Sequence, residues 1–153
     1  MGNFFVMSIR CNKCSASDFG FIINDANTAI NPNDNSLWVK CALYDFGWGK
    51  ENGFYKAPLP DFDTLINLVL YSTDREDMYG AAAVILDKFA DELLCQCEML
   101  MIDCRRKKDF KKLVELFDLK TSTNRSSITQ KTYRQIQDDY MRWKKVSEIA
   151  KRM

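Results

Sequence analysis

Cys11 and Cys14 form a C-x-x-C pair, which is the pattern in this chain with the clearest chemical potential. Two thiolates from one tight turn suit a tetrahedral zinc ion, and the same spacing at the start of a helix forms a redox pair. A zinc site needs a second pair of ligands. Cys41 stands alone, and Cys95 and Cys97 point in different directions on an expected helix. The pattern therefore favours small residues in a turn and in the core over a zinc or redox site.

Other reactive patterns are absent or do not converge. The chain has no histidine, which excludes Ser-His and Cys-His catalytic pairs and histidine metal ligands. Asp61 and Asp63, like Asp138 and Asp139, are too close in sequence to face one point on a helix. The glycines on either side of Trp48 complete neither of the phosphate-binding loop patterns. We therefore expect no catalytic residue, no cofactor and no metal, and a protein that is not an enzyme.

The first 60 residues are rich in Asn, Asp, Gly and aromatic residues, and their patterns predict strands and loops. Alternating apolar residues predict strands over 3–10, 18–24 and 37–44, and residues 31–36 are dense in turn formers. Residues 46–55 carry four aromatic residues and three glycines, which predicts a loop. Exposed aromatic residues in such a loop make good anchors for a partner, so we expect Trp48, Phe54 and Tyr55 to contact one.

Residues 61–153 show helical periodicity almost throughout and predict about five helices. Helix starts are expected at Asp61 or Asp63, at Thr73 through a capping box with Glu76, and at Asp91. A fourth segment carries Phe110, Leu113, Val114 and Phe117, and the last helix runs from about 129 to 151. The apolar stripes place ten residues in the core: Met78, Ala82, Ile85, Phe89, Leu93, Leu100, Leu113, Phe117, Tyr140 and Trp143. The same stripes include Cys97, Cys104 and Tyr133.

These patterns predict an α+β fold, with a small N-terminal antiparallel β layer over 1–60 and a mainly helical body over 61–153. The length of 153 residues fits a single domain, and 46% hydrophobic residues suffice for a core. The start of the chain lacks a secretory pattern, and Val6 breaks a myristoylation signal. We therefore expect a cytoplasmic protein with reduced cysteines and no membrane partner.

Charge is distributed unevenly along the chain. Residues 1–102 carry seven basic and 14 acidic residues, whereas residues 103–153 carry 15 basic and seven acidic residues. We expect the two parts to form an acidic side and a basic side. The acidic side would hold Asp74, Glu76, Asp77, Asp87, Asp91 and Glu92, and the basic side Arg105, Arg106, Lys108, Lys112, Arg134 and Lys145.

The basic run 105–112 predicts a partner-binding surface formed by Arg105, Arg106, Lys108 and Lys112. Arg125, which stands before the last helix, is a further candidate because it could help to hold an anion there. The simpler interpretation of the run is a solvated helix face. A nucleic-acid contact through 105–112 and the last helix is the alternative, although no known nucleic-acid motif accompanies the run.

The stretch LYSTDREDMYGAAAVIL, residues 70–86, is similar to helix pairs in HEAT-like stacks and in small cytoplasmic immunity proteins of bacterial toxin systems. The resemblance implies a non-enzymatic protein that neutralises a toxin domain by covering its surface. Nuclease-neutralising immunity proteins tend to be acidic, whereas this chain has a net charge of +1, so the class of toxin stays open. A nucleic-acid-associated protein and a small enzyme are the competing hypotheses.

We predict that the isolated protein is reduced and free of metal, because the C-x-x-C pair has no matching second pair. Elemental analysis should find less than a stoichiometric amount of zinc, and a strong chelator should leave the thermal unfolding curve unchanged. One zinc per chain, or unfolding on chelation, would contradict this prediction.

Overall fold

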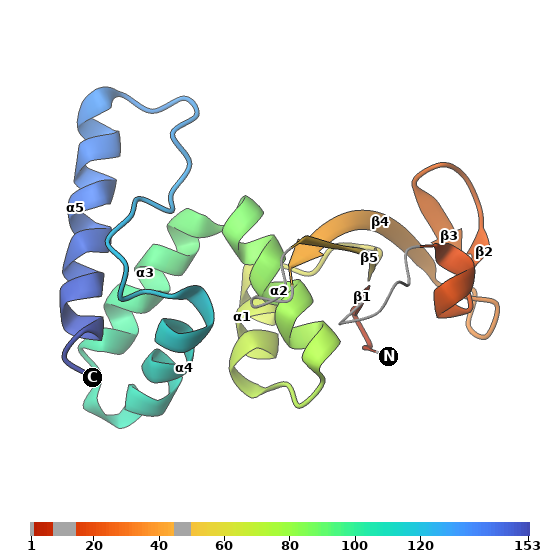
Figure 1. The fold of residues 1–153 in the computed structure, drawn as a ribbon, viewed down its shortest axis with the longest axis horizontal. Helices are drawn as coiled ribbons and strands as arrows, with labels where there is room; N and C mark the ends of the chain where they lie inside the picture. Colours follow the sequence, from red (N-terminus) through yellow and green to blue (C-terminus); the bar gives the residue numbers. More distant parts are fainter. Residues whose placement is uncertain (1, 8–14, 45–49) are drawn as a thin grey trace. The chain divides into compact units, whose positions relative to one another are not determined.

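The computed structural model describes residues 2–7, 15–44 and 50–153, which form two compact units (Figure 1). The first unit is Met1–Val84 and the second is Ile85–Met153. The division falls inside helix α2 (Arg75–Lys88), whereas the composition of the sequence changes near residue 60. An antiparallel sheet precedes five α-helices in the described part of the chain, which confirms the predicted α+β class.

The sheet of the first unit has five strands in the order β1-β5-β4-β3-β2, and all its neighbours are antiparallel. The strands are β1 (Phe5–Met7), β2 (Ile22–Ile23), β3 (Thr28–Ile30), β4 (Leu37–Tyr44) and β5 (Lys50–Lys56). The strand predicted over 37–44 is confirmed. The strand predicted over 18–24 is shorter in the structure and consists of β2 alone, because a short 3₁₀ helix, η1 (Ala16–Phe19), includes the first residues of the predicted range.

The loop predicted over 46–55 is wrong from residue 50 onward, because these residues form β5 between β1 and β4. Gly53 permits this close pairing, since a Cβ there would lie 2.5 Å from the carbonyl oxygen of Val6. Phe54 is therefore a strand residue with 5% exposure, and Tyr55 is half-buried beside it. Trp48 lies outside the described residues.

One face of the sheet carries an aromatic core. Val6, Ala29, Trp38 and Phe54 are buried there under Ala16 and Phe21. The Phe21 ring stacks on Trp38 with 5.0 Å between centroids and meets Phe54 edge-on at 5.8 Å. The η1 helix and the residues after it therefore act as the cover of this face.

Helix α1 (Phe62–Tyr71) begins as predicted after Asp61, whose carboxylate accepts the amide of Thr64 at 2.9 Å. This hydrogen bond lowers the pKa of Asp61. Helix α2 is capped by Asp74, which accepts the amide of Asp77 at 2.9 Å. The predicted capping box at Thr73 is wrong, because the Glu76 carboxylate instead accepts the amide of Met7 at 2.8 Å.

The side chain of Asp77 joins α2 to the beginning of the sheet. It is 2% exposed and accepts the amides of Asn3, Phe4 and Phe5 at 2.9 to 3.0 Å. These donors belong to an edge strand and the residues before it, where backbone groups would otherwise lack partners. Asp77 and Glu76 are therefore structural, and the expectation that they lie on an exposed acidic side is wrong.

Gly80 follows Asp77 by almost one helical turn and faces the same strand. A Cβ at Gly80 would lie 2.4 Å from the Cγ atom of Phe5, so only glycine lets the buried Phe5 ring pack against the helix. Glycine inside a helix costs about 1 kcal/mol relative to alanine. The close approach of Phe5 accounts for glycine at this position.

The second unit contains α3 (Ala90–Met101), the 3₁₀ helix η2 (Cys104–Arg106), α4 (Lys107–Phe117) and α5 (Tyr133–Ala150). Helix α3 packs against both α4 and α5. The core of this unit includes Leu93, Leu94, Cys97, Leu100, Phe110, Leu113, Val114, Phe117, Leu119, Trp143 and Val146. Of the ten predicted core residues of the whole chain, Met78, Phe89 and Tyr140 are half-buried and the other seven are buried.

Two predictions about helix starts in this unit and one about burial are wrong. Helix α3 begins one residue before Asp91, after Phe89, and Asp91 lies in its first turn. Helix α5 begins after Thr132, which forms a capping box with Gln135, rather than near residue 129. Tyr133 then lies about a quarter of a turn away from the buried stripe that contains Trp143, and it is exposed.

The helices in the described part of the chain do not combine the length and apolar character that crossing a bilayer requires.

We predict that Asp77→Ala lowers the free energy of unfolding by at least about 3 kcal/mol, because it leaves three backbone amides without their acceptor. Urea unfolding followed by circular dichroism measures the change. Asp87→Ala is the control, since Asp87 is exposed on the same helix and its loss should change stability by less than about 0.5 kcal/mol. Equal effects of the two substitutions would contradict the anchoring role of Asp77.

Candidate functional site

A strip of cationic side chains lies along η2 and α4 of the second unit. Helix α4 is amphipathic, with Phe110, Leu113, Val114 and Phe117 buried on one face. Four basic residues are exposed at the start of this helix and just before it: Arg105, Lys107, Lys108 and Lys111, here called the basic strip. The sequence places them there because helical periodicity buries the apolar stripe and turns the lysines to solvent.

The members of the predicted basic surface differ in how freely they can meet a partner. The side chain of Arg105 is 91% exposed and forms only a 3.4 Å contact with Asp103, and Lys108 is exposed. Arg106 is bound to Asp109 at 3.0 Å, and Lys112 is half-buried. Arg105 and Lys108 are therefore the predicted residues best placed for binding.

Asp103 caps the start of η2, and its carboxylate contacts Arg105 at the beginning of the basic strip. Its carboxylate accepts the backbone amide of Arg105 at 3.0 Å, and this hydrogen bond is the main cause of its lowered pKa. Exposed ion pairs of this kind contribute little to stability. Arg105 is thus free to exchange Asp103 for another anionic group.

Arg125 has a structural role that differs from the anion-binding role predicted for it. Its guanidinium group donates to the carbonyl oxygens of Asp118 and Thr121, both at 2.8 Å, and of Thr123 at 3.3 Å. The group also lies over the Trp143 ring, 5.1 Å from its centroid, and burial lowers its pKa. Arg125 therefore holds the loop before α5 and does not belong to the basic strip.

Helix α5 fixes the same loop from the other side. The indole nitrogen of Trp143 donates to the Ser126 hydroxyl at 2.9 Å, and the Ser147 hydroxyl donates to the Leu119 carbonyl at 2.7 Å. Both contacts are buried, so they are worth more than exposed hydrogen bonds. The loop between α4 and α5 is thus a packed part of the second unit.

Several acidic residues of the second unit are bound within the unit. Lys131 bridges Asp91 and Asp139 at 3.0 and 2.6 Å, and the hydrogen bond to Asp139 is the main cause of its raised pKa. Arg142 pairs with Glu98 and lies 3.6 Å from the sulfur of Cys95. Asp91 is therefore exposed, as expected, but its carboxylate is bound in an ion network within the unit.

The four described cysteines show no common site. Cys97 is buried, and this burial raises the pKa of its thiol to about 12, which suits the predicted core role. Cys95 and Cys104 are exposed, so the core role predicted for Cys104 is wrong: it stands in η2, past the end of α3. Within the described residues, no cluster of three or more Cys, Asp or Glu side chains could hold a metal ion. Cys11 and Cys14 lie outside these residues.

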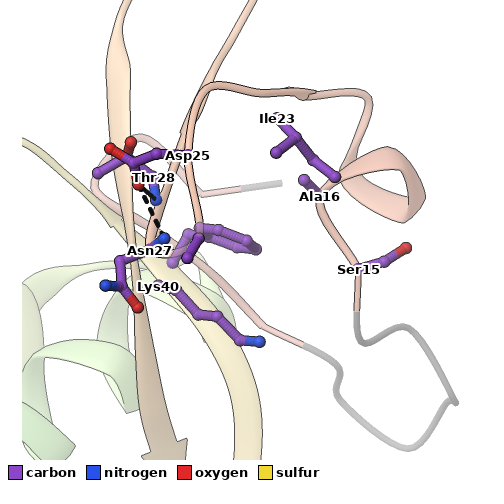
Figure 2. Close-up of a pocket in the computed structure, with 9 residues that line it drawn as sticks. Ser15, Ala16, Ile23, Asp25, Asn27, Thr28 and Lys40 are labelled. Atoms are coloured by element: carbon purple, nitrogen blue, oxygen red, sulfur yellow. Dashed lines mark hydrogen bonds between the residues drawn. The ribbon is translucent and has the colours of Figure 1, made fainter.

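The first unit contains a small cavity beside the β2–β3 hairpin, here called the hairpin pocket (Figure 2). Its volume is about 220 Å³, and its lining includes Ala16, Ile23, Asp25, Thr28, Lys40 and Phe54. Pockets for drug-sized ligands typically occupy about 300–1,000 Å³, so this one fits a group as small as a single side chain.

The sequence indicates the basic strip but not the hairpin pocket. Six basic residues between 105 and 112 are visible as a run. The only hint of the pocket is Lys40, a charged residue inside the otherwise apolar stretch 37–44. The pocket itself is assembled from η1, the hairpin and two further strands, which sequence spacing does not bring together.

Comparisons with protein families, with curated proteins and with solved structures find no match to this chain. The functional argument therefore rests on the geometry of the basic strip and the hairpin pocket.

We predict that Arg125→Lys lowers the free energy of unfolding by about 1–3 kcal/mol, because lysine cannot donate to three separated carbonyl groups in the same way. Urea unfolding measures the change, with Arg105→Lys as the exposed control. If Arg125→Lys is as stable as the control, Arg125 does not hold the loop.

Proposed function

We propose that this chain is a non-enzymatic protein-binding module that covers an acidic surface on a protein partner. Its most concrete version is a cytoplasmic immunity-type protein that neutralises a bacterial toxin domain. The observation that carries the proposal is the basic strip, whose Lys107, Lys108 and Lys111 are exposed and have no ion-pair partner among the described residues.

The arrangement of the strip supports steering of a partner. Lys107, Lys108 and Lys111 lie within little more than one turn of α4, so their charges act together on an approaching anionic surface. The apolar face of the same helix is bound in the core, which holds the lysines on a fixed element. Charges placed in this way raise association rates and orient the partner more than they add affinity.

The carboxylates on and beside the strip favour a protein partner over a nucleic acid. Asp103 and Asp109 contact Arg105 and Arg106, and Glu115 is exposed one turn beyond Lys111. A nucleic acid presents phosphates along its whole backbone, whereas Asp103 and Asp109 already occupy two of the arginines and Glu115 offers phosphates no favourable contact. A protein surface carries charges of both signs and can match the mixture.

Charge reversal tests the proposal. Affinity capture from the source cells, with nuclease present, should retain one stoichiometric protein on the wild-type chain. The variant K107E/K108E/K111E should lose it, whereas K144E/K145E/K151E should retain it, because these exposed lysines at the C-terminal part of the chain provide the same change in net charge. The association rate of the purified pair should fall as salt rises.

Other outcomes would redirect the function. Equal retention of the partner by both variants would show that the basic strip is not the interface. Capture of nucleic acid, lost with nuclease and weakened by K107E/K108E/K111E, would favour the nucleic-acid alternative. For the immunity version, the captured protein should inhibit growth when produced alone and lose this effect when the wild-type chain is produced with it.

A further inference from the structure

The hairpin pocket lies where the cover of the aromatic core ends. The strand register places Lys40 directly opposite Phe54, so both side chains lie on the face that also holds Val6, the partner of Phe54 in β1. The next row on this face contains Ile23, Ala29 and Trp38. Ala16 and Phe21 cover the second row and part of Phe54, and between the described residues a pocket remains beside Lys40.

The chemistry of the pocket is apolar at the floor and charged at the rim. Phe54 and Ala16 are almost fully buried and supply the floor, and Ile23 supplies an aliphatic wall. Figure 2 shows Lys40 extending from its strand into the space on the side of Ser15. The Lys40 ammonium group has no hydrogen-bond or ion-pair partner among the described residues, so it is available to an anion.

Asp25 stands on the other side of the rim and is engaged by the hairpin itself. Its Oδ1 atom accepts the amides of Asn27 and Thr28 at 2.8 and 2.9 Å. The first of these hydrogen bonds is the main cause of the lowered pKa of Asp25. The carboxylate thus shapes the turn, and Lys40 is the charged group of the rim that is left for a partner.

The edge of the sheet beside the pocket is apolar and exposed. Ile23 is 70% exposed and Ile22 is 61% exposed, although both are aliphatic residues of an edge strand. Proteins usually protect such an edge with charges, proline or a covering segment. A pocket with an apolar floor, an exposed aliphatic wall and a polar rim has the anatomy of the centre of a protein interface.

We infer that the hairpin pocket receives one apolar side chain, aromatic or aliphatic, from a protein partner, and that a carboxylate next to this side chain pairs with Lys40. The inference rests on the proposed function and adds an anchoring site to it, on a different unit from the basic strip. The pocket volume of about 220 Å³ suits a single side chain, and the positive charge of Lys40 favours a carboxylate beside that side chain.

Nuclear magnetic resonance with short peptides tests the pocket directly. The probes are capped tripeptides in which phenylalanine stands between two glutamates, phenylalanine stands between two lysines, or alanine stands between two glutamates. We expect the first peptide alone to shift the resonances of Ala16, Ile23 and Lys40 in a saturable way at millimolar concentration. Ile23→Glu and Lys40→Glu should each weaken this binding at least about tenfold.

Ile22→Glu is the matched control, because Ile22 is exposed on the same strand and does not line the pocket. It should bind the first peptide like the wild-type chain. The inference is overturned if no peptide shifts these resonances, if all three shift them equally, or if Ile22→Glu weakens binding as much as Ile23→Glu. Equal binding of phenylacetate would assign the pocket to a small carboxylate, and shifts that depend only on protein concentration would assign it to a second copy.

The peptide experiment is independent of the capture experiment on the basic strip. Failure of the peptides with loss of the partner in K107E/K108E/K111E would overturn the anchoring pocket and leave the protein-binding function in place. Peptide binding with no captured protein would leave the anchoring pocket in place and overturn the proposed function of the basic strip.

Discussion

The buried carboxylate of Asp77 is the constraint on which the first unit depends. It collects three amides from residues more than 70 positions away in the sequence and so joins the first strand to the second helix. A buried carboxylate needs hydrogen-bond donors, and the unpaired amides of an edge strand need acceptors. The contact between Asp77 and the start of the sheet meets both needs. Gly80 belongs to the same arrangement, since only a residue without a side chain leaves room for the Phe5 ring beside the helix. With β1 held in this way, β5 becomes an inner strand, and Phe54 and Lys40 stand opposite each other at the hairpin pocket.

The second unit divides its charges between two tasks. Lys131 and Arg142 bind carboxylates of α3 and α5, and Arg125 is bound to the main chain of its own loop. These cations hold the unit together and are not free to meet a partner. The exposed lysines of α4 have no ion-pair partner among the described residues, and on this helix they stand close together at its first turns, which is why the basic strip is the proposed recognition surface. A count of basic residues does not distinguish the two groups, and only their contacts do.

Sequence reasoning succeeded where a feature depends on residues close together in the sequence, and it failed where the interacting residues are far apart in the sequence. The strand over 37–44, the Asp61 cap and the buried stripe of α4 depend on residues within a few positions of one another, and all are correct. The failures come from residues whose partners are distant. Glu76 looks like the end of a capping box but binds Met7, and residues 50–55 look like part of a loop but belong to a strand that pairs with two others. Arg125 resembles an anion-binding residue, yet the loop folds back on it.

By itself, the sequence determined the α+β class, most of the helices, the absence of histidine chemistry and the presence of a basic run between 105 and 112. These features depend on composition and short-range periodicity, which need no knowledge of the fold. The tertiary structure alone decided which charged side chains are internal partners, which aromatic residues are core, and where a pocket remains open. These properties arise when segments distant in sequence pack together in one interior. Buried polar groups there need hydrogen-bond partners, and the sequence alone does not show which distant residue supplies the partner.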